Sequence, residues 1–184
     1  MPLFRILALT IVGLTLWGVP NIANAGQETP ALKGFSDEEI QGLLNGEGMG
    51  VAKVAELNHY PGPRHVLDLE NQLHLSTTLR AETQKIFDKM HEEAVRLGEL
   101  IIEKEQELEN LFAGNVIDSN KWKTLVREIS RLQGELRLTH LQAHLAMKNI
   151  LSPEQIKNYD LLRGYGPNTW EMPPHHHRAP SLPK

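Results

Sequence analysis

The sequence predicts an all-α protein built on a long antiparallel helical hairpin, with short N-terminal and C-terminal helices folded around it. Apolar residues recur every three or four positions along two long stretches, 76–112 and about 120–150, which a short break separates. Leu, Ala, Glu, Lys and Arg dominate the composition, and no strand-like alternation of apolar and polar residues occurs. Because the connection between the two long helices is short, they are expected to be antiparallel neighbours.

The first 25 residues have the pattern of a signal peptide. Arg5 is the only charged residue before Glu28, an apolar run covers 6–19, and small residues at 23–25 supply a cleavage site. The run is shorter than the roughly 20 residues that span a bilayer. We therefore expect export to the periplasm and a mature chain that begins at Gly26, with an uncleaved membrane anchor as the alternative.

Helix-start signals divide the rest of the chain. Residues 26–62 are predicted to be an N-terminal lead with two short helices, one opened by a capping box of Ser36 and Glu39 and a second over about 51–57. Residues 63–165 are predicted to form the hairpin domain, in which a first-turn proline at 63 opens a further short helix over 65–72. Residues 166–184 are rich in proline and histidine, so we expect a disordered tail.

Composition and motifs argue against several classes of function. The formal net charge of −4 disfavours nucleic acid as a partner, because nucleic-acid binding usually needs a basic face. The absence of cysteine excludes disulfides and thiolate metal sites. No strand precedes the glycines at 46, 48 and 50, so a nucleotide-binding loop is not expected. With no triad and no zinc-protease motif, we expect neither an enzyme nor an organic cofactor.

Two similar five-residue sequences open helices. Residues 151–155 read Leu-Ser-Pro-Glu-Gln, a capping box with proline at the first helical position, and residues 75–79 read Leu-Ser-Thr-Thr-Leu. Such L-[T/S]-x-x-Q sites in an exported helical chain resemble the Spy/CpxP/ZraP periplasmic family, known for its LTxxQ motif. Residues 60–67 and 161–165 resemble the heavy-metal resistance or periplasmic heavy-metal sensor branch, which includes CnrX-like sensors. The resemblance covers about 63–165, and at position 79 leucine replaces the motif's glutamine.

Two histidines on the second long helix are the strongest candidate ligands. His140 and His144 are four residues apart and share one helix face, so they can chelate one divalent ion such as zinc, nickel, cobalt or copper. The alternative is that they are two partly exposed helix histidines that bind no metal. Counting back from the predicted turn places His140 opposite about His91 or Glu92 on the first long helix.

Further ligands follow from the resemblance and from the tail. CnrX-type sensors take histidines from before the first long helix, a glutamate on that helix, and a histidine with a methionine on the last long helix. The resemblance therefore implies that His65, Glu82 and Met147 complete the site around His140 or His144. The tail histidines His175, His176 and His177 form a weaker second candidate.

Three functions remain open. The first is a periplasmic metal-binding protein for heavy-metal sensing or resistance and envelope stress, the second an ATP-independent folding chaperone, and the third a signalling adaptor without metal. We expect a homodimer, because a two-helix hairpin exposes an apolar stripe that a monomer does not cover. The family resemblance adds unfolded envelope proteins, or a membrane sensor or anti-sigma partner, as candidate partners.

Overall fold

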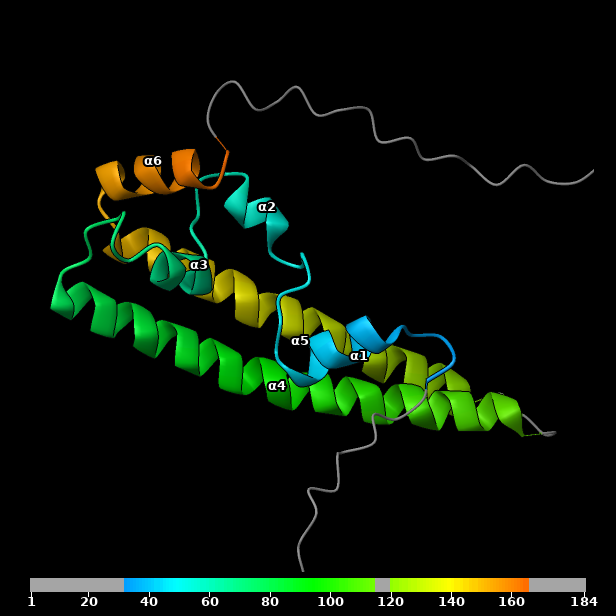
Figure 1. Ribbon diagram of the computed structural model, residues 1–184. Coiled ribbons are helices and arrows are strands. Elements are labelled where there is room, and N and C mark those ends of the chain that lie inside the picture. Colours follow the sequence, from blue (N-terminus) through cyan, green and yellow to red (C-terminus); the bar gives the residue numbers. More distant parts are fainter. Residues whose placement is uncertain (1–31, 115–119, 166–184) are drawn as a thin grey trace, which may run out of the picture.

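The computed structural model describes residues 32–114 and 120–165, and Figure 1 shows their arrangement. Within these ranges the chain forms helices and no strand, which confirms the predicted all-α class. The predicted signal peptide, the predicted tail and the centre of the hairpin turn lie outside the described residues.

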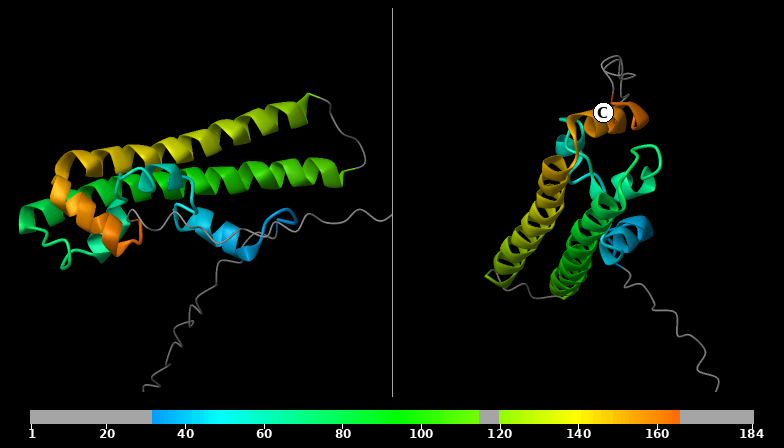
Figure 2. Two further views of the ribbon diagram at one scale, coloured as in Figure 1. Left: turned by 90° about the horizontal axis from the view of Figure 1, so that it is seen from above. Right: turned by 90° about the vertical axis from the view of Figure 1, so that its left-hand side faces the viewer.

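The long hairpin consists of α4 (Thr77–Ala113) and α5 (Lys121–Ile150), which lie side by side in both orientations of the molecule (Figure 1 and Figure 2). Ser76 caps α4 by accepting a hydrogen bond from the backbone N–H of Leu79 at 3.2 Å. One face of each helix is buried at the predicted spacing of three or four residues. The buried residues of α5 are Leu125, Ile129, Leu132, Leu136, His140, Ala143, His144 and Met147.

Helix α1 (Asp37–Leu44) begins with the predicted capping box of Ser36 and Glu39 and packs on α4. The contact is so close that a Cβ at Gly98 of α4 would lie 2.0 Å from the carbonyl oxygen of Leu43. The apolar cluster formed here is called the turn-side core. It contains Leu32, Ile40, Leu43, Ala94, Leu97, Ile101, Ile102, Leu132 and Leu136.

Three short helices gather at the other end of the hairpin: α2 (Lys53–Glu56), α3 (Pro63–Asp68) and α6 (Pro153–Leu162). Helix α6 has the predicted capping box, in which Ser152 and Gln155 exchange hydrogen bonds of 3.1 Å. The apolar cluster beneath these helices is called the open-end core. It contains Val66, Leu73, Met147, Leu151, Ile156 and Tyr159.

The sequence pattern overestimates the lengths of two short helices before the hairpin. A helix was predicted over 65–72, but the observed helix α3 ends at Asp68. The chain then continues in turns that place Leu73 in the open-end core. Likewise, the predicted segment 51–57 is helical only over α2. None of the helices within 32–114 and 120–165 is long and apolar enough to cross a membrane.

Candidate metal site

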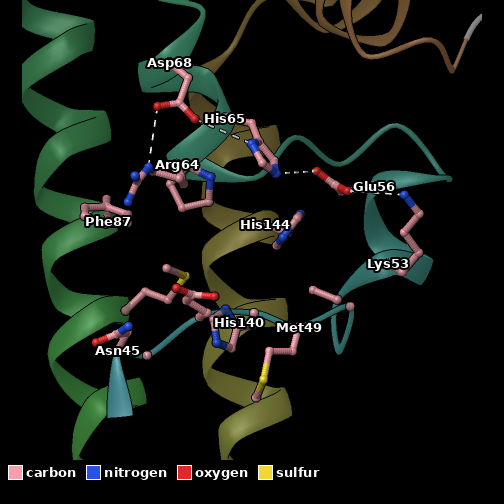
Figure 3. A pocket seen from close by; sticks show the side chains of 17 residues that line it. Asn45, Met49, Lys53, Glu56, Arg64, His65, Asp68, Phe87, His140 and His144 are labelled. Atoms are coloured by element: carbon pink, nitrogen blue, oxygen red, sulfur yellow. Dashed lines mark ion pairs between the residues drawn. The ribbon is translucent and has the colours of Figure 1, made fainter. Parts of the chain in front are cut away.

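A cavity of about 430 Å³ lies where the short helices meet the hairpin (Figure 3). Its floor is formed by His140 and His144 of α5, and α4 contributes Phe87 and Met90. The opposite walls come from the 45–50 loop, from α2 and from the first turn of α3. The cavity therefore brings together residues that are about 100 positions apart in the sequence.

His144 is held in one orientation by the backbone of the loop before α3. Its Nδ1 lies 2.8 Å from the carbonyl oxygen of Tyr60, and a carbonyl can only accept a hydrogen bond. In the neutral ring the proton therefore sits on Nδ1, and Nε2 carries the free lone pair. Metal-binding histidines in proteins are oriented by the same kind of contact. A Cβ at Gly62 would lie 3.2 Å from this Nε2, so a glycine leaves space in front of it.

His140 lies one turn further along the floor of the cavity and is only 4% exposed. Its Nε2 has no hydrogen-bond partner among the described residues, which is costly for a buried polar atom. Burial lowers the pKa of His140 to about 4, and the nearby His144 and His91 add to this effect. The influence of His91 agrees with the predicted position of His140 across the hairpin. The ring is therefore neutral, which is the form that binds metal.

His65 reaches the cavity from the first turn of α3, which Pro63 opens as predicted. Its Nε2 lies 3.7 Å from Oε1 of Glu56, and its Nδ1 lies 3.6 Å from a carboxylate oxygen of Asp68. Burial, together with the positive charge of Arg163, lowers the pKa of His65 although the two carboxylates act in the opposite direction.

Glu56 of α2 also lines the cavity, and the sequence did not indicate it. It is a buried carboxylate whose two oxygens accept hydrogen bonds from Tyr159 at 2.8 Å and from Tyr165 at 3.1 Å. Burial acts to raise the pKa of Glu56, but the Tyr159 hydrogen bond and the neighbouring His65 outweigh it and hold the pKa below its usual range. Glu56 is therefore an ionised carboxylate facing the histidines.

The other predicted ligands lie elsewhere. Met147 is fully buried in the open-end core, and Glu82 lies exposed on α4 outside the cavity. His175, His176 and His177 lie outside the described residues. Within 32–114 and 120–165, no group of three or more His, Asp or Glu side chains is arranged to hold a metal ion. The cavity nevertheless fits an ion in its chemistry, because His140 has an unpartnered buried nitrogen and His144 a fixed free lone pair.

Among the described residues, the chain is a small all-helical protein whose long hairpin carries histidines in a cavity toward one end. The sequence pattern described as heavy-metal resistance matches residues 44–157, which is more than half of the chain and includes the whole hairpin. The protein therefore belongs to the heavy-metal resistance family, and the resemblance found in the sequence is confirmed. No curated protein and no solved structure matches the chain significantly.

Proposed function

We propose that the protein is a periplasmic metal-binding protein that acts in heavy-metal sensing or resistance. One observation carries the proposal: His144, whose Nδ1 is held by the Tyr60 carbonyl, lines a cavity together with His65, His140 and the buried carboxylate of Glu56. Membership of the heavy-metal resistance family supports the same conclusion. The periplasmic location rests on the signal-peptide pattern of the first 25 residues.

These side chains are not arranged as a metal-binding group in this structure. We propose that an ion draws together Nε2 of His65, Nε2 of His144 and the carboxylate of Glu56, with His140 as the adjacent fourth group. Imidazole nitrogens with one carboxylate oxygen suit zinc, cobalt, nickel and copper(II), and such a set disfavours calcium and magnesium, which prefer oxygen alone. Glu56 takes the place that the family resemblance gave to Glu82, because Glu56 lines the cavity and Glu82 does not.

Calorimetric titration with zinc, nickel, cobalt and copper tests the function. The protein used is the mature chain, 26–184, in which His175, His176 and His177 are replaced by glutamine, because tail histidines would add their own signal. We expect a Kd tighter than about 100 µM for at least one ion, and His65→Ala, His140→Ala and His144→Ala should each weaken it at least about tenfold.

His74→Asn is the matched control. His74 lies outside the cavity and has a φ of +49°, a conformation that asparagine tolerates. Its replacement should leave the affinity unchanged. If none of the four ions binds more tightly than about 100 µM, the proposed function is wrong. Such weak binding is what two helix histidines, His140 and His144, would give without further ligands.

A second candidate function is ATP-independent chaperoning of unfolded envelope proteins. It is favoured by large apolar side chains that α5 and α6 expose, namely Leu138, Leu145, Leu161 and Leu162. We expect modest suppression of aggregation of a denatured client at equimolar dose, without an effect of ATP. A complete lack of suppression across several clients would leave metal binding as the better candidate.

A further inference from the structure

Residues 60–63 read Tyr-Pro-Gly-Pro, and their backbone packs against the imidazole of His144. We infer that this segment is the positioning element of His144 and that Gly62 determines what can approach its Nε2. The inference rests on the proposed function, in which Nε2 of His144 binds an ion, and it assigns the residues that orient this nitrogen and keep it open. Three features of the segment support it.

The first feature is that the segment offers the imidazole an acceptor and no donor. The carbonyl oxygen of Tyr60 lies 2.8 Å from Nδ1 of His144. The two prolines have no N–H group. The two remaining N–H groups are used elsewhere: that of Tyr60 donates to the carbonyl of Ala55 at 3.1 Å, and that of Gly62 donates to the hydroxyl of Tyr159 at 3.3 Å. The segment therefore fixes the proton on Nδ1, and Nε2 meets no donor from it.

The second feature is that the segment is itself held in place on α5. Both of its prolines are fully buried. Lys148, one turn after His144, donates to the carbonyl of His59 at 2.7 Å, and its ammonium group lies 5.2 Å from the centre of the Tyr60 ring. Two successive turns of α5 therefore bind two successive carbonyl groups of the chain. The orientation of His144 is thus set relative to its own helix.

The third feature is a glycine that the backbone does not require. Gly62 has φ −84° and ψ 139°, an extended conformation that any residue can adopt and that a residue before proline prefers. A Cβ placed there would nevertheless lie 3.0 Å from Cε1 and 3.2 Å from Nε2 of His144, which is closer than a Cβ normally approaches. The next atom, Oε1 of Glu56, would be 3.7 Å away. The imidazole therefore explains the glycine, and the backbone conformation does not.

His144 has little freedom to yield to such a methyl group. Its Nδ1 is hydrogen-bonded to the Tyr60 carbonyl, and the residue is only 7% exposed. An alanine at position 62 would therefore crowd the edge of the ring that contains Cε1 and Nε2. Because zinc binds an imidazole nitrogen at about 2.0 to 2.1 Å, a carbon 3.2 Å from Nε2 competes with the ion for space. Glycine at position 62 keeps this nitrogen open.

A double-mutant cycle in urea tests the contact without any metal. Gly62→Ala should lower the urea midpoint of the unmutated protein, because the methyl group meets the imidazole. In a His144→Ala background the imidazole is gone. The same change should then leave the midpoint unchanged or raise it, since alanine restricts the unfolded chain more than glycine does. Equal losses in the two backgrounds would show that Gly62 does not act through His144 and would overturn the inference.

Chemical modification tests the access to Nε2. Diethyl pyrocarbonate acylates imidazole nitrogens that carry a free lone pair, and peptide mass spectrometry gives the rate at His144 itself. Gly62→Ala should slow this rate at least about threefold. Gly134→Ala adds the same methyl group to α5 where no atom lies within 4 Å of it, and it should leave the rate unchanged. An unchanged or faster rate in Gly62→Ala, or no reaction at His144 in the unmutated protein, would overturn the inference.

Metal titration of the mature chain with the three tail histidines replaced by glutamine connects the segment to the function. Gly62→Ala should weaken binding of the tightest of the four ions at least about tenfold, and Gly134→Ala should not change it. If the unmutated protein binds none of the ions, the proposed function fails, and the urea cycle and the modification rate still decide whether the segment positions His144. If an ion binds and His144→Ala removes that binding, but Gly62→Ala leaves the affinity unchanged, the function stands and the role of Gly62 is wrong.

Discussion

The two ends of the hairpin differ in the kind of side chain that they bury. The turn-side core consists of apolar side chains only and is closed by the direct contact of α1 with Gly98. The open end buries Glu56, Thr83, His140, His144 and Asp160 next to its apolar cluster. Each buried polar group costs free energy unless it is fully hydrogen-bonded.

This difference indicates where stability and function lie. The three buried side-chain atoms without a hydrogen-bond partner among the described residues are Nε2 of His140, Oδ1 of Asp160 and Nε of Arg163. All three belong to the open end. Functional sites commonly keep such costly groups while the rest of the fold compensates for them. We propose that the turn-side core stabilises an open end that is arranged for binding.

The largest expected effect comes from breaking the turn-side core. In Gly98→Ala the new methyl group would lie 2.0 Å from the carbonyl oxygen of Leu43, and backbone cannot move away as a flexible side chain can. Helix α1 must therefore shift away from α4. We expect the free energy of unfolding to fall by about 3 kcal/mol, measured by urea denaturation.

Gly134→Ala is the control for this substitution. Gly134 also lies inside a long helix, but no atom lies within 4 Å of a Cβ placed there. Because alanine is the better helix former, this change should stabilise the protein by about 0.5 to 1 kcal/mol. Equal effects of the two substitutions would show that close packing at Gly98 does not matter.

The second prediction concerns acid and the open end. In the folded protein the pKa of His140 is lowered from 6.5 to about 4, so between these values the unfolded chain binds a proton that the folded chain does not. The stability linked to this group is complete above pH 6.5, is lost progressively as the pH falls from 6.5 to about 4, and is gone below that. Lowering the pH from 7 to 4.5 should therefore cost about 2 to 3 kcal/mol through His140 alone.

His140→Leu isolates this contribution, since leucine does not titrate and removes the unpartnered Nε2. The neighbouring His91 of α4 and His144 of α5 remain in the variant, so the two proteins differ only at position 140. Urea denaturation at pH 7 and pH 4.5 should show a smaller loss of stability in the variant. Parallel losses in the two proteins would mean that His140 does not carry the effect.

The fold could be predicted from the sequence because its signals are local. The capping boxes at Ser36 and Ser152, the proline at 63 and the apolar spacing of the long helices each depend on residues within a few positions. The short segments were less predictable. Residues 69–72 are predicted to be helical, but they lie in turns that place Leu73 in the open-end core, which is a tertiary effect.

The candidate site could be predicted only in part, for the same reason. His140 and His144 share a face because of helical spacing, and both line the cavity. Glu56 is more than 100 residues from Tyr159 and Tyr165, and only the packing of α2 beside α6 brings them together. No local pattern distinguishes this glutamate from the many exposed ones, nor indicates that the Tyr60 carbonyl orients His144.

The third prediction concerns a surface rather than a core. Leu138 and Leu145 are seven residues apart on α5 and are 50% and 53% exposed, so they form an apolar strip suited to a second copy of the chain. We propose that this strip forms the homodimer. Leu145→Glu should weaken the dimer at least about tenfold, or roughly 1.4 kcal/mol, by sedimentation equilibrium. Leu161→Glu on α6 is the control, and a monomeric mass for the unmutated protein at micromolar concentration would contradict the proposal.

The last prediction distinguishes two glutamates, one buried and one exposed. Glu56 is buried beside His65, whereas Glu82 is exposed on α4 and lies outside the cavity. Glutamine at position 56 keeps a group that accepts the tyrosine hydrogen bonds but loses the charge, so Glu56→Gln should weaken zinc binding at least about tenfold. Glu82→Gln removes the same charge from a solvated position and should change the zinc Kd less than about twofold. A strong loss from Glu82→Gln, with little from Glu56→Gln, would show that the ion is bound by the ligand set implied by the family resemblance, and the cavity ligands would have to be reassigned.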